Sequence, residues 1–235
     1  MKKSISLSFV AVGIMLLCAA IGISAYNIWD ARNARISVES VMEQIVKARV
    51  TEEAVPTAPE SAETEHNDPG SADAPPAEAP VTEAPVPRQE PEEIPLYKLN
   101  PQLAMPTMEI DGRNYVGVLE IPVLSLTLPI IGEWSYPSLK LAPCVYTGTA
   151  YLNNMVIAGH NYTSHFGGLS RLRYGDRVVF TDFDGNVFQY KVREIETIKG
   201  TDIDGMVESG WALSLFTCTI GGQMRITVRC ECVSE

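Results

Sequence analysis

The second half of the chain, residues 105–235, predicts an all-β domain. Short runs rich in β-branched and apolar residues alternate there with turn signals at intervals of roughly 8–12 residues. The dipeptides Asp184-Gly185 and Gly221-Gly222 are strong signals for tight hairpins, because both turn positions need a positive φ. Only three stretches leave room for short helices, namely 137–141, 166–174 and 202–210. This pattern is typical of a β-barrel or β-sandwich.

There are nine such runs, two of which adjoin, and together they amount to roughly seven or eight strands. They are expected at residues 115–122, 126–131, 145–149, 154–160, 177–181, 186–192, 193–198, 213–218 and 225–229.

Residues 1–29 predict a cytoplasmic tip and a transmembrane signal anchor. The apolar centre of this segment, Leu7 to Ala25, would span roughly 28 Å as a helix, close to the bilayer core of about 30 Å. Lys2 and Lys3 favour a cytoplasmic N-terminus. A cleaved signal peptide is the alternative, because Ile23-Ser24-Ala25 resembles a cleavage site, but the run is longer than the apolar region of most signal peptides. The rest of the chain is exported in either case.

Two further segments precede the β-domain. Residues 30–50 predict a juxtamembrane helix, whose apolar side chains recur at helical spacing and would lie on the membrane or pair with a second copy. Residues 51–104 are rich in Pro, Glu and Ala and predict a disordered spacer that holds the domain away from the membrane.

Charge and cysteine spacing exclude several classes of function. The net charge of −11 is concentrated in the spacer, and no basic arm or face points to nucleic acid. Cys230 and Cys232 form a Cys-x-Cys pair without a matching His or Cys cluster, so neither a metal site nor a cofactor is expected. Cys144 has the option of a disulfide with either of them in an exported protein, and Cys18 lies in the apolar run.

The hairpin of residues 213–229 brings a thiol beside a guanidinium. If Gly221-Gly222 forms the two-residue loop, counting outward puts Cys218 opposite Arg225. Directly opposed residues in an antiparallel pair project to the same face, with Cβ atoms roughly 4.5–5.5 Å apart. A neighbouring cation favours the thiolate, which is the nucleophilic form of cysteine.

His160 is the expected proton acceptor for this thiol. It ends the apolar run Met155–His160 and precedes a polar loop, so it is expected to face a cleft. His165 lies in that loop and is the less constrained candidate, and His66 lies in the spacer. A nucleophilic cysteine needs a base that later acts as an acid for the leaving amine, and imidazole has a suitable pKa.

With these features in view, residues 110–235 resemble the sortase family. The resemblance is carried by motifs in the same order and strand context: Gly117-Val-Leu-Glu-Ile-Pro122, Leu128-Pro-Ile-Ile131, Gly148-Thr149, Val156-Ile-Ala-Gly-His160, Gly175-Asp176, Tyr190, Leu215-Phe-Thr-Cys218 and Arg225-Ile-Thr-Val228.

The resemblance implies a closed eight-stranded β-barrel and a cysteine transpeptidase. By similarity Cys218 is the nucleophile and His160 the general acid and base, while Arg225 orients the substrate and stabilises the oxyanion. Thr217 lines the groove for the sorting signal. Arg225 is preferred to Arg229, because it precedes the Ile-Thr-Val run and is the residue opposite Cys218 in the expected register.

The chain also departs from the family pattern. Phe216 stands where a polar or aliphatic residue is common, and no Asp-Pro-aromatic lid precedes the barrel. These departures leave the subclass and the signal sequence open.

The implied partners follow from this chemistry. They are LPxTG-like C-terminal sorting signals of surface proteins, an amine nucleophile from a peptidoglycan precursor or a pilin lysine, and the membrane of a Gram-positive cell, with the catalytic domain outside. Two alternatives remain at this point. One is an exported cysteine peptidase that hydrolyses peptidoglycan peptides, and the other is an inactive, wall-tethered β-barrel that serves as an interaction module.

Overall fold

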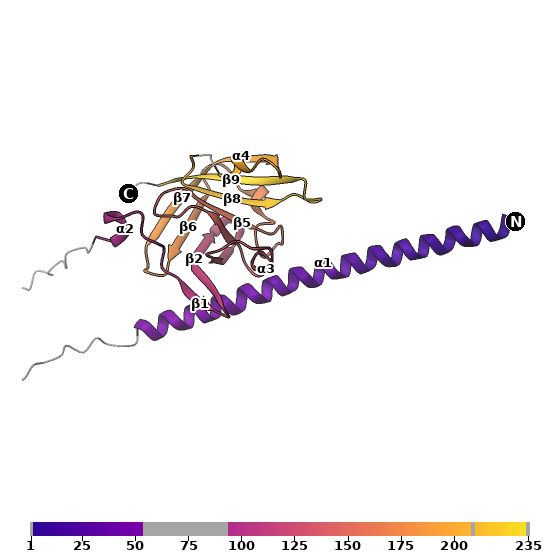
Figure 1. Cartoon of the computed structure of the whole chain (residues 1–235), viewed down its shortest axis with the longest axis horizontal. Helices are drawn as coiled ribbons and strands as arrows, with labels where there is room; N and C mark the ends of the chain where they lie inside the picture. The colour runs from indigo at the N-terminus through magenta and orange to yellow at the C-terminus, as the bar shows by residue number, and fades with distance from the viewer. Residues whose placement is uncertain (1, 54–93, 208–209, 234–235) are drawn as a thin grey trace, which may run out of the picture.

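The computed structural model describes residues 2–53, 94–207 and 210–233, and its second half forms a closed β-barrel (Figure 1). The apolar faces of the strands meet inside the barrel, where side chains such as Leu119, Ile130 and Leu215 are fully buried. The strands are β1 (Met108–Ile110), β2 (Arg113–Ile121), β3 (Leu126–Ile131), β4 (Cys144–Thr147), β5 (Met155–Gly159), β6 (Arg177–Asp182), β7 (Val187–Lys199), β8 (Leu213–Cys218) and β9 (Met224–Cys232).

The barrel closes through strand β2. The sheet runs in the order β1-β2-β3-β4-β5-β8-β9-β7-β6, and β2 also pairs with β6. Eight strands therefore form the closed ring, while β1 pairs only with the first residues of β2. Gly117 lies where β2 meets β6, and a Cβ there would come within 2.3 Å of the Thr181 carbonyl oxygen. The glycine thus allows the close approach that closes the barrel, and the predicted eight-stranded barrel is confirmed.

Two details of the strands differ from the prediction. The short strand β1 was not expected, because a three-residue run carries too little periodicity to be recognised. Strand β7 is one continuous element where two adjoining runs were predicted. Its pairing with β9 shifts register between Val192 and Glu194, so a bulge interrupts the alternation without ending the strand.

Short helical segments fill the connections between the strands. Three of the segments between barrel strands fall in or next to the stretches where the sequence predicts short helices. The segment before β3 was not predicted. The segments are η1 (Pro122–Leu124), α3 (Tyr136–Leu139), η2 (Leu169–Arg171) and α4 (Ile203–Val207), and α2 (Leu96–Leu99) precedes the barrel.

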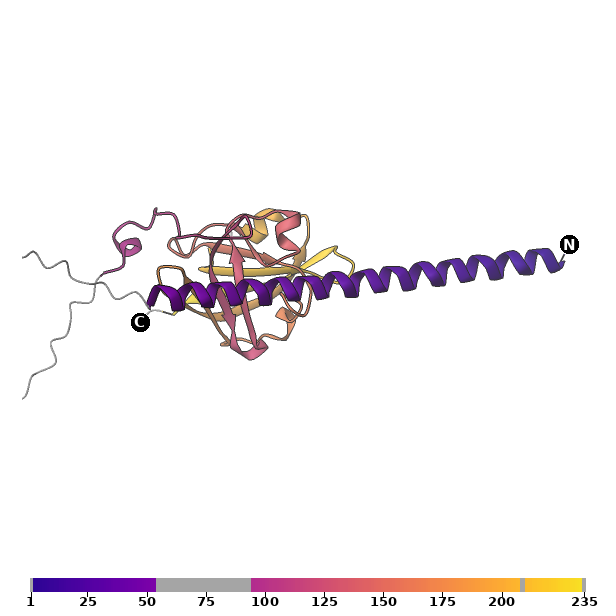
Figure 2. The same cartoon turned by 90° about the horizontal axis from the view of Figure 1, so that it is seen from below.

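The N-terminal helix α1 (Lys2–Glu53) is continuous, and its second half packs against the barrel (Figure 2). Its apolar residues there lie on one side of the helix, because their spacing follows the helical repeat. The side chains buried in this contact are Ala34, Val38, Val41 and Ile45. Each fully buried Val or Ile contributes about 1.5–3 kcal/mol, so apolar packing dominates the docking. Two polar contacts add to it, from Gln44 to Asp111 (3.4 Å) and from Arg49 to the Asp182 carbonyl (3.3 Å).

This docking gives the apolar face of residues 30–50 a partner that the sequence did not suggest. A membrane surface or a second copy was expected, and the face is covered by the barrel of the same chain. Most of the predicted spacer, residues 54–93, lies outside the described residues. Its described end packs on the barrel, where the Tyr97 ring stacks on Tyr151 with centroids 4.7 Å apart.

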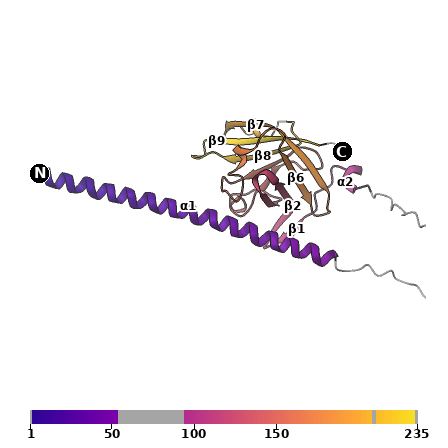
Figure 3. The same cartoon turned by 180° about the vertical axis from the view of Figure 1, so that it is seen from behind.

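The first half of α1 projects beyond the barrel (Figure 3). This helix is long and apolar enough to cross a membrane, with a mean hydropathy of 2.3 in its most apolar window. Side chains along this part are exposed, as Phe9 and Leu16 illustrate.

Candidate active site

The β8–β9 hairpin brings Cys218 and Arg225 together in the predicted register. The two residues are directly paired, and the register continues without a shift to Leu213 and Cys230. The turn itself is wider than the expected two-residue loop. The Gly222 amide donates to the Thr219 carbonyl oxygen (2.9 Å), and the Thr219 amide donates to that of Met224 (3.0 Å). Because the loop grows by one residue on each side, the pairing of Cys218 with Arg225 is unchanged.

His160 lies next to the same end of the sheet. Strands β5 and β8 are parallel, and their last paired residues are Gly159 and Thr217. His160 directly follows β5, and Cys218 is the residue of β8 that follows Thr217. The carboxyl ends of parallel strands lie at the same edge of a sheet, so the two residues lie side by side there. The adjacent strands β5, β8 and β9 therefore bring an imidazole, a thiol and a guanidinium to one end of the barrel.

The loop after His160 is folded tightly against the strand. The Phe166 amide donates to the His160 carbonyl oxygen (3.0 Å), and the ring of Phe166 lies fully buried under Gly159. A Cβ on Gly159 would lie 2.5 Å from that ring. The glycine before the histidine is thus required by packing, and it helps to fix where His160 leaves the strand.

His160 is half-buried, with a stacked tyrosine ring beside it and two charged side chains near enough to affect its pKa. Tyr162 stacks on it with ring centroids 4.7 Å apart and planes 30° apart. Burial lowers the pKa of His160, the charge of Asp30 acts against this effect, and the charge of Lys140 adds to it. The ring therefore favours the neutral form, which can accept a proton.

His165 lies in a different environment, although it is in the same loop. Its side chain is fully buried. Burial lowers the pKa of His165 to about 4, the positive charge of His160 adds to this effect, and a backbone contact with Leu141 opposes it. His165 is therefore a neutral packing residue at ordinary pH and not a group that meets solvent.

Arg225 is half-buried, and its guanidinium is folded onto the hairpin's own turn. Its Nη1 donates to the carbonyl oxygens of Gly222 (2.7 Å) and Met224 (3.1 Å). The same nitrogen lies close to Gly200, where an added Cβ would be only 2.9 Å away. The loop after β7 thus limits the space in which this side chain moves.

Arg229 has a structural environment. Only 1% of its surface is exposed, and Nε donates to Glu196 (2.8 Å). Its Nη1 donates to the hydroxyl of Ser214 (2.9 Å) and to the Met206 carbonyl oxygen (3.0 Å). Arg229 therefore ties the α4 segment to the barrel wall and has no surface to offer to a substrate.

Thr217 is also buried, at 2% exposure. Its hydroxyl has no hydrogen-bond partner among the described residues. Because neighbouring strand residues project to opposite faces, the Thr217 side chain lies on the other face of β8 from Cys218.

All five cysteines are free thiols, so the disulfide left open above is not formed. Burial raises the pKa of Cys144 to about 12 and that of Cys230 to about 12, which keeps both protonated. Cys218 is half-buried, while Cys18 and Cys232 are exposed. Among the described residues, no group of three or more His, Cys, Asp or Glu side chains has a geometry that would hold a metal ion.

An aromatic row flanks the nucleophile candidate and was not predicted. Phe216 lies two residues before Cys218, on the same face of β8, and meets Tyr146 edge to face with centroids 5.4 Å apart. Tyr146 meets Trp134 in the same way at 5.7 Å, and Trp134 is 38% exposed. The sequence signal was the unusual Phe216, but its partners come from a distant loop and strand.

The neighbours of His160 were also missed. Tyr162 could have been predicted as a neighbour from the sequence, since it lies only two residues after His160. Asp30 and Lys140 could not have been predicted, because they come near His160 only through the docking of α1 and the turn after α3.

The chain was compared with protein-family models, curated proteins and solved structures. The Sortase domain model matches residues 119–233. None of the curated proteins compared with the chain matches it.

Among solved structures, sortase A from Corynebacterium diphtheriae is similar at 22% identity and a TM-score of 0.46, covering 52% of this chain and 62% of that one. Streptococcus pneumoniae sortase C has 21% identity and a TM-score of 0.45, covering 52% and 70% of the two chains. Sortase C from Clostridium perfringens SM101 has 26% identity and a TM-score of 0.44, covering 52% and 71%. The chain thus spans less than two thirds of the length of the first of these proteins.

Proposed function

Because the chain belongs to the sortase family, we propose that it is a membrane-anchored cysteine transpeptidase that acts on LPxTG-like sorting signals. The observation that carries the proposal is the shared end of strands β5, β8 and β9, which supports a common site for His160, Cys218 and Arg225. Their order across three neighbouring strands suits a base, a nucleophile and an oxyanion donor.

In the first half-reaction the Cys218 sulfur attacks the carbonyl carbon of the Thr–Gly type bond in the signal. The C–S bond forms and the C–N bond breaks, which leaves a thioester on the enzyme. His160 takes the proton of the Cys218 thiol as the sulfur attacks and then donates it to the leaving amine, as an imidazole of suitable pKa can do. Between substrates, the half-buried ring favours its neutral form.

In the second half-reaction an amine attacks the thioester. The new C–N bond forms, the C–S bond breaks, and His160 takes the proton that the incoming amine loses and passes it to the departing Cys218 sulfur. The amine is proposed to come from a peptidoglycan precursor or a pilin lysine. The similar sortase C of Streptococcus pneumoniae was described for its pilin substrate specificity, which makes the pilin lysine a candidate to test.

Arg225 is proposed to stabilise the oxyanion in both half-reactions. Fixed donors of this kind contribute about 10²–10³ in rate. In the free protein its Nη1 is bonded to the carbonyl oxygens of Gly222 and Met224. The substrate carbonyl is therefore proposed to compete with these turn carbonyls for the guanidinium.

Thr217 is proposed, by similarity to the family, to line a peptide-binding groove beside Cys218, and its own side chain is buried on the other face of β8. One further feature supports this groove. The row of Phe216, Tyr146 and Trp134 offers an apolar wall on the face of β8 that carries Cys218.

The proposed location is the cell membrane, with a single pass and a cytoplasmic N-terminus. The support is the apolar first half of α1 and the two lysines that precede it. The barrel would then face the wall of a Gram-positive cell, where the sorting signals are exposed.

The test is a transpeptidation assay on the full chain in detergent micelles. An LPxTG-type peptide is supplied with a glycine-based or lysine amine, and the products are separated by mass. We expect an amine-linked product from the wild type and from Cys232→Ala, which removes an exposed thiol away from the hairpin end, and none from Cys218→Ala. Hydrolysis alone would favour the peptidase alternative, and no turnover in the wild type would favour the interaction module.

A further inference from the structure

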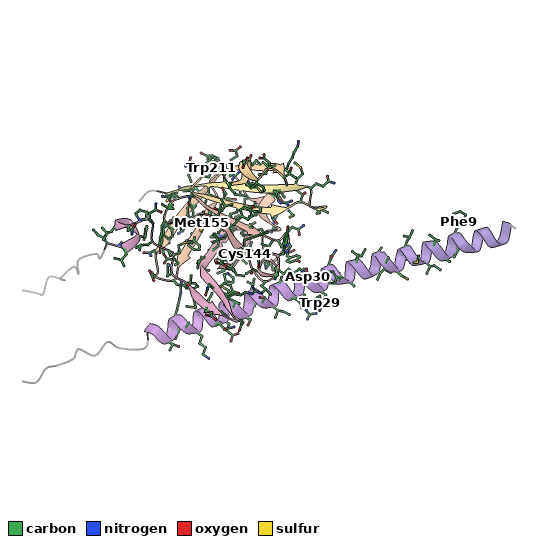
Figure 4. The ribbon with its side chains drawn as sticks, in the orientation of Figure 1. Phe9, Trp29, Asp30, Cys144, Met155 and Trp211 are labelled. Carbon is green, nitrogen blue, oxygen red and sulfur yellow. The ribbon has the colours of Figure 1, made fainter. Side chains whose placement is uncertain are left out.

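Asp30, on the anchor helix α1, contacts the loop that follows His160. The Tyr162 hydroxyl donates a hydrogen bond to Asp30 Oδ2. The other oxygen, Oδ1, lies 3.9 Å from Lys140 Nζ. Only 18% of the Asp30 side chain is exposed, and Figure 4 labels it where α1 meets the barrel. One carboxylate of the membrane anchor thus binds two groups of the barrel beside the candidate base.

Tyr162 transmits this contact to His160. Its ring stacks on the imidazole at 4.7 Å, so the position of one ring limits the position of the other. Burial and the hydrogen bond to Asp30 raise the pKa of Tyr162, which keeps its hydroxyl a donor. The Gly167 amide donates to the Tyr162 carbonyl oxygen (2.9 Å), so Tyr162 is held from its backbone as well as from its hydroxyl.

The titratable groups near His160 come from three elements. Asp30 faces it from α1, Lys140 from the turn after α3, and Tyr162 and His165 from its own loop. Asp30 is the group that favours the protonated imidazolium, while burial and Lys140 oppose it. Asp30 therefore acts on His160 in two ways, by holding the stacked tyrosine and by supplying negative charge.

The position of Asp30 depends on the docking of α1. The buried residues Ala34, Val38, Val41 and Ile45 follow it on the same helix and seal the helix onto the barrel. A barrel without this helix lacks the carboxylate altogether, and the Tyr162 hydroxyl loses its acceptor.

We propose that Asp30 is a positioning residue for His160, acting through Tyr162, so that the catalytic site is complete only when the membrane anchor is docked. The inference rests on the proposed function, in which His160 is the acid and base. It adds that the anchor helix is part of the active site as well as a tether.

The test uses the full chain in detergent micelles and four variants. Asp30→Asn removes the charge, Asp30→Glu keeps it, Tyr162→Phe keeps the stacked ring but removes the hydroxyl, and Glu43→Gln removes an exposed charge elsewhere on α1. Two readouts are compared. One is the pH profile of kcat and KM for peptide transfer, and the other is the NMR titration of the His160 ring, assigned with a His160→Gln variant.

For Asp30→Asn we expect kcat to fall about tenfold, with KM for the peptide nearly unchanged. The pKa of His160 falls further below its ordinary value, because the charge that favours the imidazolium is gone. The limb of the pH profile that requires protonated His160 moves to lower pH. Asp30→Glu restores most of the rate, and Glu43→Gln resembles the wild type. Tyr162→Phe lowers kcat while the pKa of His160 stays near that of the wild type, since the Asp30 charge remains.

An Asp30→Asn variant that is folded and docked, with the His160 titration and pH profile of the wild type, would overturn the inference. If this variant releases α1, Tyr162→Phe carries the test, and a wild-type kcat there overturns it. The NMR titration needs no turnover, so a wild type without transpeptidase activity would refute the proposed function and still leave the Asp30 effect on His160 measurable.

Discussion

At the scale of single residues, two arginines on strand β9 lie in opposite environments. Arg225 lies near the turn of the hairpin with half-exposed surface, and Arg229 is enclosed by four bonding groups from three elements. The sequence alone predicts that Arg229→Ala leaves most turnover. The burial of Arg229 changes this expectation, because loss of its side chain is expected to lower the stability of the fold and, through it, the activity.

Arg225→Ala is expected to lower kcat/KM by about 10²–10³ with little change in stability. Arg229→Ala is expected to lower the free energy of unfolding by about 3 kcal/mol, because Glu196, Ser214 and two carbonyl groups lose their partner. Urea denaturation of both variants, followed by steady-state kinetics below the unfolding transition, separates the two effects. Equal losses of stability in the two variants would contradict the assignment.

His165 makes the barrel sensitive to acid. Its pKa is about 4 in the folded protein and about 6.5 when unfolded, so the unfolded state binds more protons between these values. The free energy of unfolding is therefore not reduced by this group above about pH 6.5. It falls as the pH drops towards about 4, by about 3 kcal/mol in all. We expect the urea midpoint to fall over this range. In His165→Phe, which keeps an apolar ring of similar size, this part of the pH dependence should vanish, and its persistence would assign the effect to other groups.

At the scale of elements, the sequence predicts local pairing well and long-range docking poorly. The register of the β8–β9 hairpin follows from counting outward from two glycines, and it is unaffected by the wider turn because the loop grows symmetrically. The barrel strands follow from period-two patterns. The role of Asp30 does not follow, because an apolar face at helical spacing fits a membrane, a second helix or a barrel equally well. Only the three-dimensional fold shows that Val38, Val41 and Ile45 face strand β3 and its neighbours.

The docking of α1 is tested by a charge on its buried face. Val41 is 4% exposed and Val46 is 55% exposed on the same helix. Val41→Asp is expected to release residues 30–50 from the barrel, because a buried carboxylate without a partner is strongly unfavourable. Val46→Asp should leave the helix docked. Hydrogen exchange of the α1 amides gives the readout, with faster exchange expected in the Val41 variant alone. Equal exchange in both variants would mean that the helix is not held by this face.

At the scale of the whole molecule, the site end of the barrel points along α1 towards its apolar half. The tip of the β8–β9 hairpin is directed that way in each view of the ribbon (Figures 1–3). From Ala25, where the apolar run ends, to Asp30, beside the site, the helix rises about 7.5 Å. In the proposed orientation the active site is therefore close to the membrane surface, where the docked helix α1 holds the barrel.

The height of the active site above the membrane can be changed without altering the face of α1 that packs on the barrel. A seven-residue helical insertion between Tyr26 and Asn27 adds about 10 Å and rotates the helix by only about 20°. We expect transfer of a soluble peptide to be unaffected and transfer of a substrate whose signal lies next to its own membrane span to fall several-fold. An insertion of the same length after residue 53, beyond the docked face, serves as the control. Equal losses with both substrates would show that the insertion damages the site itself.

The central claim is that Cys218 forms the covalent intermediate. The most direct measurement is mass mapping of the full chain after brief incubation with an LPxTG-type peptide, before any amine is added. We expect one acyl group, bound as a thioester on the peptide that contains Cys218 and released when the amine is supplied. An acyl group on Cys232, or turnover of the peptide with no adduct in the wild type and undiminished in Cys218→Ala, would contradict it.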